Sequence, residues 1–241
     1  MSQTLISRAG YSGAEHMSDV VVHLVALVAA LAGVPVLIAL AVIWHGNVSA
    51  VTAISVYGVT LIAMIGCSAL YNAFPRAGLS WLYQRLDHAA IYFKIAGTYT
   101  PFTLLSGQGG WLLTGLWGAA LAGSGLRAFA SGRWKWVAFG LYLAMGWAAV
   151  LVGWPMLAAL SAPVLGLMLT GGILYTVGTV FLLWERLPFH NTIWHVFVMS
   201  ATAVFFVAVT LHLSDSAVPA AAPPQGALPP STVPGASPGI F

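Results

Sequence analysis

Apolar segments of nearly uniform length recur along the whole chain and constrain its fold more than any other feature. Seven of them cover residues 20–44, 51–71, 89–105, 112–128, 136–154, 164–184 and 193–213. A helix needs about 20 apolar residues to cross the ~30 Å hydrocarbon core of a bilayer, and each segment is near that length. With 60% hydrophobic and 5% charged residues, the chain is far below the ~25% charge of a soluble domain. The sequence therefore predicts an all-α membrane protein, a seven-transmembrane helix bundle.

The regions on either side of the apolar segments have a different composition. Residues 1–17 contain no sustained apolar core, so we expect a retained N-terminal segment and not a signal peptide. Residues 18–213 form the predicted seven-transmembrane domain. Residues 214–241 are rich in Pro, Ala, Gly and Ser, with Asp215 as the one charge. Such a stretch cannot bury enough apolar surface to fold, so we expect a disordered tail.

Basic residues are distributed unevenly among the connections between these segments. They precede the first segment and lie in the connections after the second, fourth and sixth: Arg8, Arg76, Arg85, Arg127, Arg133, Lys135 and Arg186. Connections on the other side of a seven-span bundle carry no Lys or Arg. Because cytoplasmic loops are enriched in Lys and Arg, the pattern places the N-terminus in the cytoplasm and the C-terminus outside.

The remaining composition excludes several classes of protein. A net charge of +3 from scattered basic residues is too small for a nucleic-acid surface, which leaves membrane lipid as the expected partner. Cys67 is the single cysteine, so neither an intramolecular disulfide nor a multi-cysteine metal site is available. Lipid-facing and partner-facing apolar surfaces look alike in sequence, so no oligomeric state is predicted.

Polar residues gather at one end of the predicted bundle. The cytoplasmic ends of the segments carry most of the ionisable side chains and several amides and hydroxyls: Glu15, Asp19, His23, Ser68, Asn72, Asp87, His88, Asn191 and His195. Lys94 lies inside the third segment. Ionisable residues within a membrane are costly and are functional candidates by default. Topology alone therefore predicts a polar cluster, formed by residues far apart in the sequence.

The spacing of this cluster leaves its chemistry open. Three pairs are four residues apart, which puts both side chains on one helix face: Asp19 with His23, Ser68 with Asn72, and Asn191 with His195. Amides are poor ligands for transition metals beside imidazole and carboxylate. The residue types therefore favour a hydrogen-bonded network over a metal site. Single residues also have simpler interpretations, since Asp87 could cap a helix or pair with Arg85 and Lys94 could reach toward the cytoplasm.

Several motifs in the chain resemble those of a known family. They lie at residues 68–71, 86–92, 96–102, 171–178 and 193–198, and Glu15 and His23 resemble polar positions of the family's first span. On these motifs the chain is identified as a member of the hemolysin III family, related to progestin and adipoQ receptors and to alkaline ceramidases. The resemblance runs from about residue 15 to 211 and excludes the tail.

The resemblance implies a fold and a site. It implies seven spans with a cytoplasmic N-terminus, in agreement with the distribution of basic residues. It also implies a zinc ion held by three histidines, one closing the second span and a His-x-x-x-His pair opening the seventh. Ser68, Asp87 and His195 match that pattern. On this basis Asp87 and Ser68 are candidate catalytic residues and His195 is a candidate metal ligand, in a site that looks like that of an amide hydrolase.

The chain departs from the pattern at the metal ligands. Asn72 stands where the histidine of the second span is expected, and Asn191 stands where the first histidine of the seventh span is expected. Phe205 occupies a position that is often histidine in the family. One of the three expected imidazoles remains, and a zinc site of this kind needs several strong ligands. We therefore expect zinc to be weakly bound or absent.

These observations lead to three functional hypotheses. The first is a protein of the bacterial inner membrane that binds a lipid or senses membrane state, with the zinc site degraded and the remaining polar residues, Lys94 among them, forming a ligand-binding or structural network. The second is a zinc-dependent hydrolase of a lipid amide or ester, and the sequence leaves the choice between enzyme and non-enzyme open. The third and weakest is a pore-forming cytolysin, because no polar stripe runs through a whole span.

Overall fold

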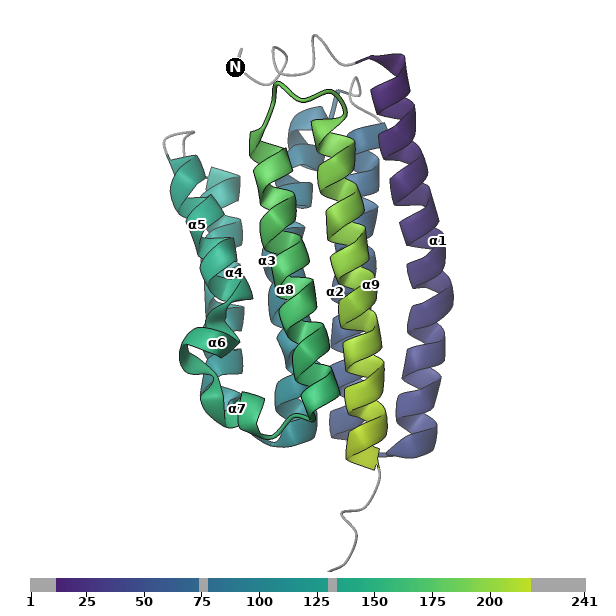
Figure 1. Cartoon of the computed structure of the whole chain (residues 1–241), viewed down its shortest axis with the longest axis vertical. Coiled ribbons are helices and arrows are strands. Elements are labelled where there is room, and N and C mark those ends of the chain that lie inside the picture. The colour runs from purple at the N-terminus through teal and green to yellow at the C-terminus, as the bar shows by residue number, and fades with distance from the viewer. Residues whose placement is uncertain (1–11, 74–77, 130–133, 218–241) are drawn as a thin grey trace, which may run out of the picture.

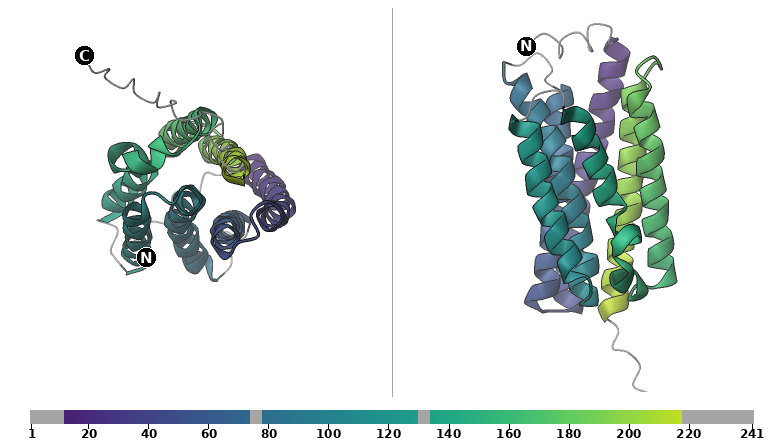
Figure 2. Two further views of the ribbon diagram at one scale, coloured as in Figure 1. Left: turned by 90° about the horizontal axis from the view of Figure 1, so that it is seen from below. Right: turned by 90° about the vertical axis from the view of Figure 1, so that its left-hand side faces the viewer.

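The computed structural model describes residues 12–73, 78–129 and 134–217, which are entirely helical apart from short connections. The long helices run side by side along one axis (Figure 1) and are seen end on in Figure 2, left. In chain order they are α1 (Gly13–Trp44), α2 (Val48–Ala73), α3 (Ser80–Ser106), α4 (Gly110–Phe129), α5 (Lys135–Gly146), α6 (Ala148–Val152), α7 (Trp154–Ala158), α8 (Ala162–Leu183) and α9 (His190–Ala217).

Local sequence signals set the boundaries of the helices. Ser12 and Glu15 form a capping box at the start of α1, in which the Ser12 hydroxyl accepts from the Glu15 backbone N–H and the Glu15 carboxylate accepts from the Ser12 N–H. This arrangement satisfies two backbone donors that a helix start leaves without partners. At the end of α3, Gly107 has a φ of 66°, a left-handed conformation that glycine adopts without a steric penalty.

The polarity of the bundle is inverted relative to a soluble protein. Large apolar side chains lie exposed along the outer face of α1, including Leu24, Val25 and Val28, while Asp19 and His23 on the same helix are 0% and 1% exposed. Exposed apolar surface of this extent requires lipid or a partner protein to cover it. The described part of the chain is therefore a membrane protein with its polar groups inside.

The number of spans is supported only in part. Among the described residues, four helices are long and apolar enough to cross a membrane: α1, α2, α8 and α9. Helix α3 is less apolar because it contains polar residues. Four of them are buried inside the bundle: Lys94, Thr98, Thr100 and Thr103. It packs against α2, α4, α5, α7 and α9, so its polar side chains face protein and not lipid. The seven-span count and the orientation of the termini stay predictions.

A break divides the segment predicted as the fifth span, residues 136–154. Helices α5, α6 and α7 replace one continuous helix, with interruptions at Trp147 and Gly153. Breaks inside a membrane are tolerated where other groups bond the freed backbone. Here the Tyr99 hydroxyl donates to the Gly146 carbonyl at 2.8 Å and accepts from the Ala149 N–H at 3.2 Å. One side chain of α3 therefore bonds both sides of the first break.

Two predicted boundaries differ from the structure. Helix α1 begins at Gly13, inside the predicted 1–17 segment, because the capping box starts the helix ahead of the apolar run. Helix α9 continues to Ala217, past the predicted start of the tail at residue 214. There the Ser216 hydroxyl bonds the His212 carbonyl. The rest of the predicted tail, together with Arg8, Arg76 and Arg133, lies outside the described residues.

Candidate functional site

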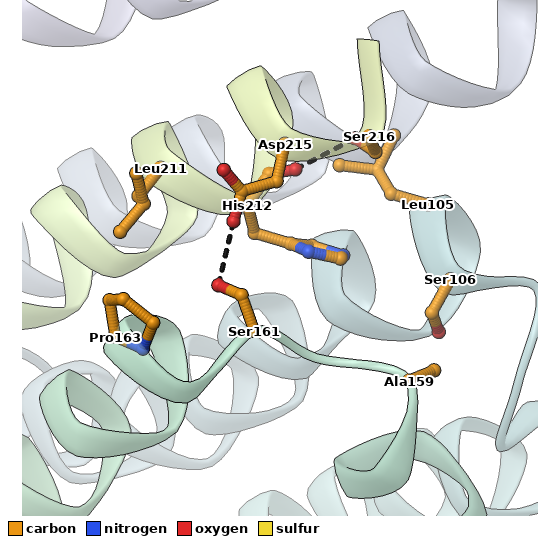
Figure 3. Close-up of a pocket in the computed structure, with 9 residues that line it drawn as sticks. All are labelled: Leu105, Ser106, Ala159, Ser161, Pro163, Leu211, His212, Asp215 and Ser216. Carbon is orange, nitrogen blue, oxygen red and sulfur yellow. Dashed lines mark hydrogen bonds between the residues drawn. The ribbon is translucent and has the colours of Figure 1, made fainter. Parts of the chain in front are cut away.

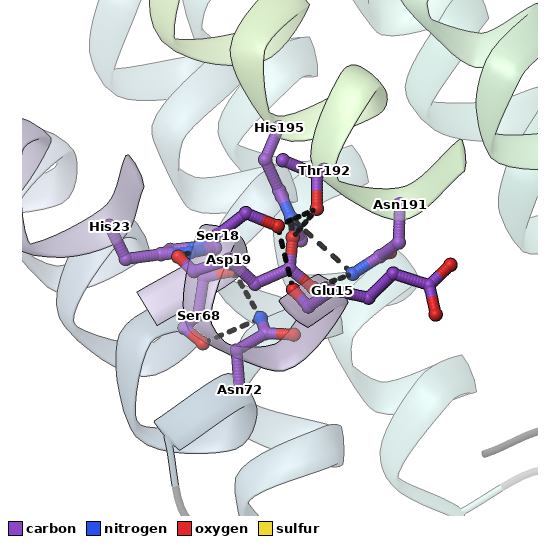
Figure 4. A network of polar contacts seen from close by, with 9 residues as sticks. All are labelled: Glu15, Ser18, Asp19, His23, Ser68, Asn72, Asn191, Thr192 and His195. Atoms are coloured by element: carbon purple, nitrogen blue, oxygen red, sulfur yellow. Dashed lines mark hydrogen bonds and ion pairs between the residues drawn. The ribbon is translucent and has the colours of Figure 1, made fainter. Parts of the chain in front are cut away.

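A buried set of polar side chains joins α1, α2 and α9 at one end of the bundle (Figure 4). We call this set the end cluster, and its members are Glu15, Ser18, Asp19, His23, Ser68, Asn72, Asn191, Thr192 and His195. The start of α1, the end of α2 and the start of α9 meet at this end (Figure 1). The predicted convergence of three pairs of residues, each four apart, is thus present in the structure.

Asp19 forms the centre of the end cluster. Its carboxylate is 0% exposed and accepts a hydrogen bond from the Thr192 hydroxyl at 2.7 Å and another from the Asn191 amide at 2.8 Å. Nδ1 of His195 lies 3.5 Å from Oδ1 of the same carboxylate. A buried carboxylate is tolerated when hydrogen bonds replace its lost hydration. The side chain of Asp19 therefore ties α1 to α9.

His23 connects Asp19 to α2. Its Nδ1 lies 2.7 Å from the Asp19 carbonyl oxygen, and because a carbonyl only accepts, Nδ1 must carry a proton. Nε2 lies 2.9 Å from the Ser68 hydroxyl, which donates to it if the imidazole is neutral. The Asn72 amide donates to the Ser68 carbonyl at 2.8 Å. The His23 and His195 rings meet edge to face, with centroids 4.3 Å apart.

The rim of the end cluster is less deeply buried. Glu15 and Asn191 are half-buried. The Glu15 carboxylate accepts from the Phe189 backbone N–H at 2.9 Å, and the Ser18 hydroxyl lies 3.0 Å from that of Thr192. Glu15 thereby joins the start of α1 to the connection between α8 and α9. The rim carries a carboxylate that faces the end of the bundle.

Three predicted members lie elsewhere or at the edge. His88 contacts the Arg127 guanidinium of α4, so it faces away from α9. Asp87 is half-buried near the start of α3. Lys94 lies two turns further along α3 and donates to the Tyr175 hydroxyl at 2.7 Å. The interpretation of Lys94 as reaching toward the cytoplasm is wrong, since the side chain is 4% exposed and hydrogen-bonded inside the bundle.

Comparison with known proteins identifies the family. A sequence profile described as "Haemolysin-III related" matches residues 13–206. The chain belongs to the hemolysin III family. "Hemolysin-3" of Bacillus cereus is 39% identical over 176 residues, covering 72% of this chain and 80% of that protein. The "Hemolysin-3 homolog" of Bacillus subtilis is 36% identical over 171 residues, covering 70% and 80%. The human "Monocyte to macrophage differentiation factor" is 28% identical over 173 residues, covering 67% and 70%.

The zinc ion implied by the resemblance to the hemolysin III family does not fit the donors in the end cluster. Zinc sites in proteins use three or four ligands drawn from Cys, His, Asp and Glu. Among the described residues, no group of three or more such side chains could hold a metal ion. Asn191, at an expected ligand position, donates to Asp19, and Asn72, at another, donates to Ser68. Both amides serve a hydrogen-bonded network.

A second site of interest lies at the opposite end of the bundle. A pocket of about 520 Å³ is lined by the ends of α3, α7, α8 and α9, with Ser161, His212 and Asp215 among its residues (Figure 3). The Ser161 hydroxyl donates to Asp215 at 2.7 Å. His212 is 4% exposed, so it lies buried behind this pair. Sequence reasoning missed the pocket because its lining comes from separate segments with no shared motif.

Proposed function

We propose that this protein is a seven-span protein of the bacterial inner membrane whose end cluster binds the headgroup of a membrane lipid. In this proposal the N-terminus is cytoplasmic and α5, α6 and α7 together make the fifth span. Lipid binding at a site that joins α1 to α9 would couple membrane composition to the packing of the bundle. The protein would then sense membrane state without a chemical reaction.

The observation that carries the proposal is the bonding of Asp19. Its carboxylate takes hydrogen bonds from an amide and a hydroxyl of α9, where a metallohydrolase would need a strong metal ligand. We therefore propose that zinc is weakly bound or absent, and that the network is a binding and structural element.

The charge of the rim favours a particular class of lipid. Glu15 on the rim and the buried Asp19 behind it accept hydrogen bonds from neutral groups, so this end of the cluster has negative character. A lipid with a primary amine, such as phosphatidylethanolamine, would supply both a positive charge and N–H donors to these acceptors. Phosphatidylcholine has the charge but no N–H, and phosphatidylglycerol has neither an amine nor a positive charge.

A thermal-shift experiment in detergent tests the proposal. Phosphatidylethanolamine should raise the unfolding temperature, phosphatidylcholine should do so less, and Glu15→Gln should remove most of the difference. Glu185→Gln is the matched control, because Glu185 is an exposed acid outside the end cluster. An equal response to both lipids, or an unaltered response in Glu15→Gln, would contradict the proposed headgroup site.

The zinc-dependent hydrolase remains as a second candidate, on one observation. His23, His195 and Asp19 lie near one another, with the two rings 4.3 Å apart and Nδ1 of His195 3.5 Å from the carboxylate. Their present arrangement does not form a metal site, so the hydrolase would require these side chains to rearrange around the ion. Elemental analysis of protein purified without chelators decides between the two. About one zinc per chain that is lost in His195→Ala, with release of fatty acid from a lipid amide, would favour the hydrolase.

A further inference from the structure

A buried cation occupies the middle of the bundle, away from both ends. Lys94 is 4% exposed and lies near the centre of α3. Its ammonium donates to the Tyr175 hydroxyl of α8 at 2.7 Å, and that hydroxyl lies 2.7 Å from the Thr202 hydroxyl of α9. The ammonium also lies 4.8 Å from the centroid of the Tyr175 ring and 5.2 Å from that of Phe205. We call Lys94, Tyr57, Tyr175, Thr202 and Phe205 the Lys94 site.

The partners of this ammonium are all uncharged. A hydroxyl and two aromatic faces stabilise a cation to a limited degree, whereas a buried charge generally requires an opposite charge. An ammonium has three N–H donors, and the described hydrogen bonds of Lys94 use one of them. Within the described part of the chain, the contacts of the Lys94 ammonium thus leave it with spare donors and include no carboxylate.

A second buried donor lies on α2, packed against the aromatic residues next to the Lys94 site. Tyr57 of α2 is 1% exposed, and its hydroxyl is without a hydrogen-bond partner among the described residues. Its ring lies 6.4 Å, centroid to centroid, from that of Phe206, the residue that follows Phe205 of the Lys94 site in the chain. An unsatisfied buried hydroxyl is costly and seldom occurs without a reason. The phenol O–H and the ammonium N–H groups both require an acceptor.

We infer that the Lys94 site binds one small monovalent anion of about the size of chloride. Such an ion would accept from the Lys94 ammonium and the Tyr57 hydroxyl together, and it would neutralise the buried charge. Water would accept the same hydrogen bonds but would leave the charge uncompensated. This inference does not depend on the proposed lipid site, because the two sites share no residue.

Close packing around the site argues for a small ion. A Cβ added at Gly171 of α8 would lie 2.5 Å from the Phe205 ring, so the wall on that side has no spare room. Lys94 and Tyr57 are both almost completely buried. A lipid headgroup would require the helices to separate, so the inferred ligand is limited to a small ion.

The test is a chloride titration of the full-length protein in detergent. Sodium gluconate keeps the ionic strength constant, radioactive chloride binding is measured by equilibrium dialysis, and the unfolding temperature is followed in parallel. We expect saturable binding of about one chloride per chain and an unfolding temperature that rises with occupancy. Absence of saturable binding to the wild-type protein would overturn the inference.

Three variants locate the ion. Lys94→Met should abolish chloride binding, and Tyr57→Phe, which removes a single oxygen, should weaken it about tenfold. Arg85→Met is the control, because it removes a positive charge from an exposed position and should leave binding unchanged. Retention of chloride by Lys94→Met would overturn the assignment. If Lys94→Met does not fold, the chloride affinity of Tyr57→Phe tests the assignment instead. An unchanged affinity in Tyr57→Phe would overturn the inference that chloride binds at the Lys94 site.

Discussion

The end cluster and the Lys94 site hold buried charged groups in opposite ways. In the end cluster, the Asp19 carboxylate is surrounded by donors from α9 that meet its demand for hydrogen bonds. In the Lys94 site, the ammonium and the Tyr57 hydroxyl are donors that face no matching charge. The comparison separates a network that is complete within the described chain from one that lacks an acceptor. The first is suited to fixing helix positions, and the second to binding an ion.

Histidines placed at the two asparagine positions should produce the largest change. In Asn72→His/Asn191→His, the end cluster would gain two imidazoles beside His195 and approach the ligand set that the family resemblance implies. Zinc affinity should rise about a thousandfold or more, giving about one zinc per chain by elemental analysis. The same pair of changes combined with His195→Ala is the control and should lose the metal. Equal zinc content in the wild-type protein would show that the native cluster already binds it.

Removal of the Asp19 carboxylate should have the next largest effect, a decrease in the free energy of unfolding. Asp19→Ala leaves the Asn191 amide and the Thr192 hydroxyl without their acceptor. We expect the free energy of unfolding to fall by about 2–4 kcal/mol, measured by titration with a denaturing detergent. Asp215→Ala is the matched control, because that exposed carboxylate bonds only Ser161 among the described contacts, and its cost should be under about 0.5 kcal/mol. A similar cost for both variants would mean that the end cluster does not hold α1 against α9.

The sequence predicted the end cluster better than the Lys94 site, for a physical reason. Residues four apart share a helix face, and alternating topology brings the ends of distant helices to one level. Those two rules were enough to group Asp19, His23, Ser68 and His195. Rotation of each helix about its own axis is set by packing, which neither rule describes. His88 was therefore assigned to the end cluster, although it faces Arg127 of α4.

The position of Lys94 also could not be predicted from the sequence. Sequence alone shows a charge within an apolar segment and cannot distinguish a side chain that reaches the interface from one that is enclosed. Enclosure depends on α3 being the central helix, in contact with α2, α4, α5, α7 and α9. The low hydropathy of α3 is consistent with a central position in the bundle, because a helix with several buried threonines is unsuited to face lipid. The broken segment of α5, α6 and α7 likewise depends on a tertiary partner, Tyr99.

A methyl group added at Gly171 should test the packing that confines the Lys94 site. The new Cβ would meet the Phe205 ring at 2.5 Å, so Gly171→Ala must displace the aromatic ring beside the ammonium. We expect a cost of about 1–3 kcal/mol in the free energy of unfolding. Gly166→Ala on the same helix is the control, because nothing lies within 4 Å of its added Cβ. That variant should be neutral or stabilising by up to about 1 kcal/mol, and equal effects would argue against close packing at Phe205.

Replacement of the buried lysine by methionine should have the smallest effect, and it contrasts most directly with Asp19→Ala. Methionine keeps the length and apolar contacts of the stem, and the Tyr175 hydroxyl retains Thr202 as a partner. A buried charge without an opposite charge costs free energy, so its removal offsets the loss of the hydrogen bond to Tyr175. In chloride-free buffer we therefore expect Lys94→Met to change the free energy of unfolding by less than about 1 kcal/mol. In saturating chloride the wild-type protein should be the more stable of the two, since a ligand that binds the folded state stabilises it. A large loss of stability in both buffers would mean that the ammonium has a permanent structural partner, and the contrast between the two sites would then disappear.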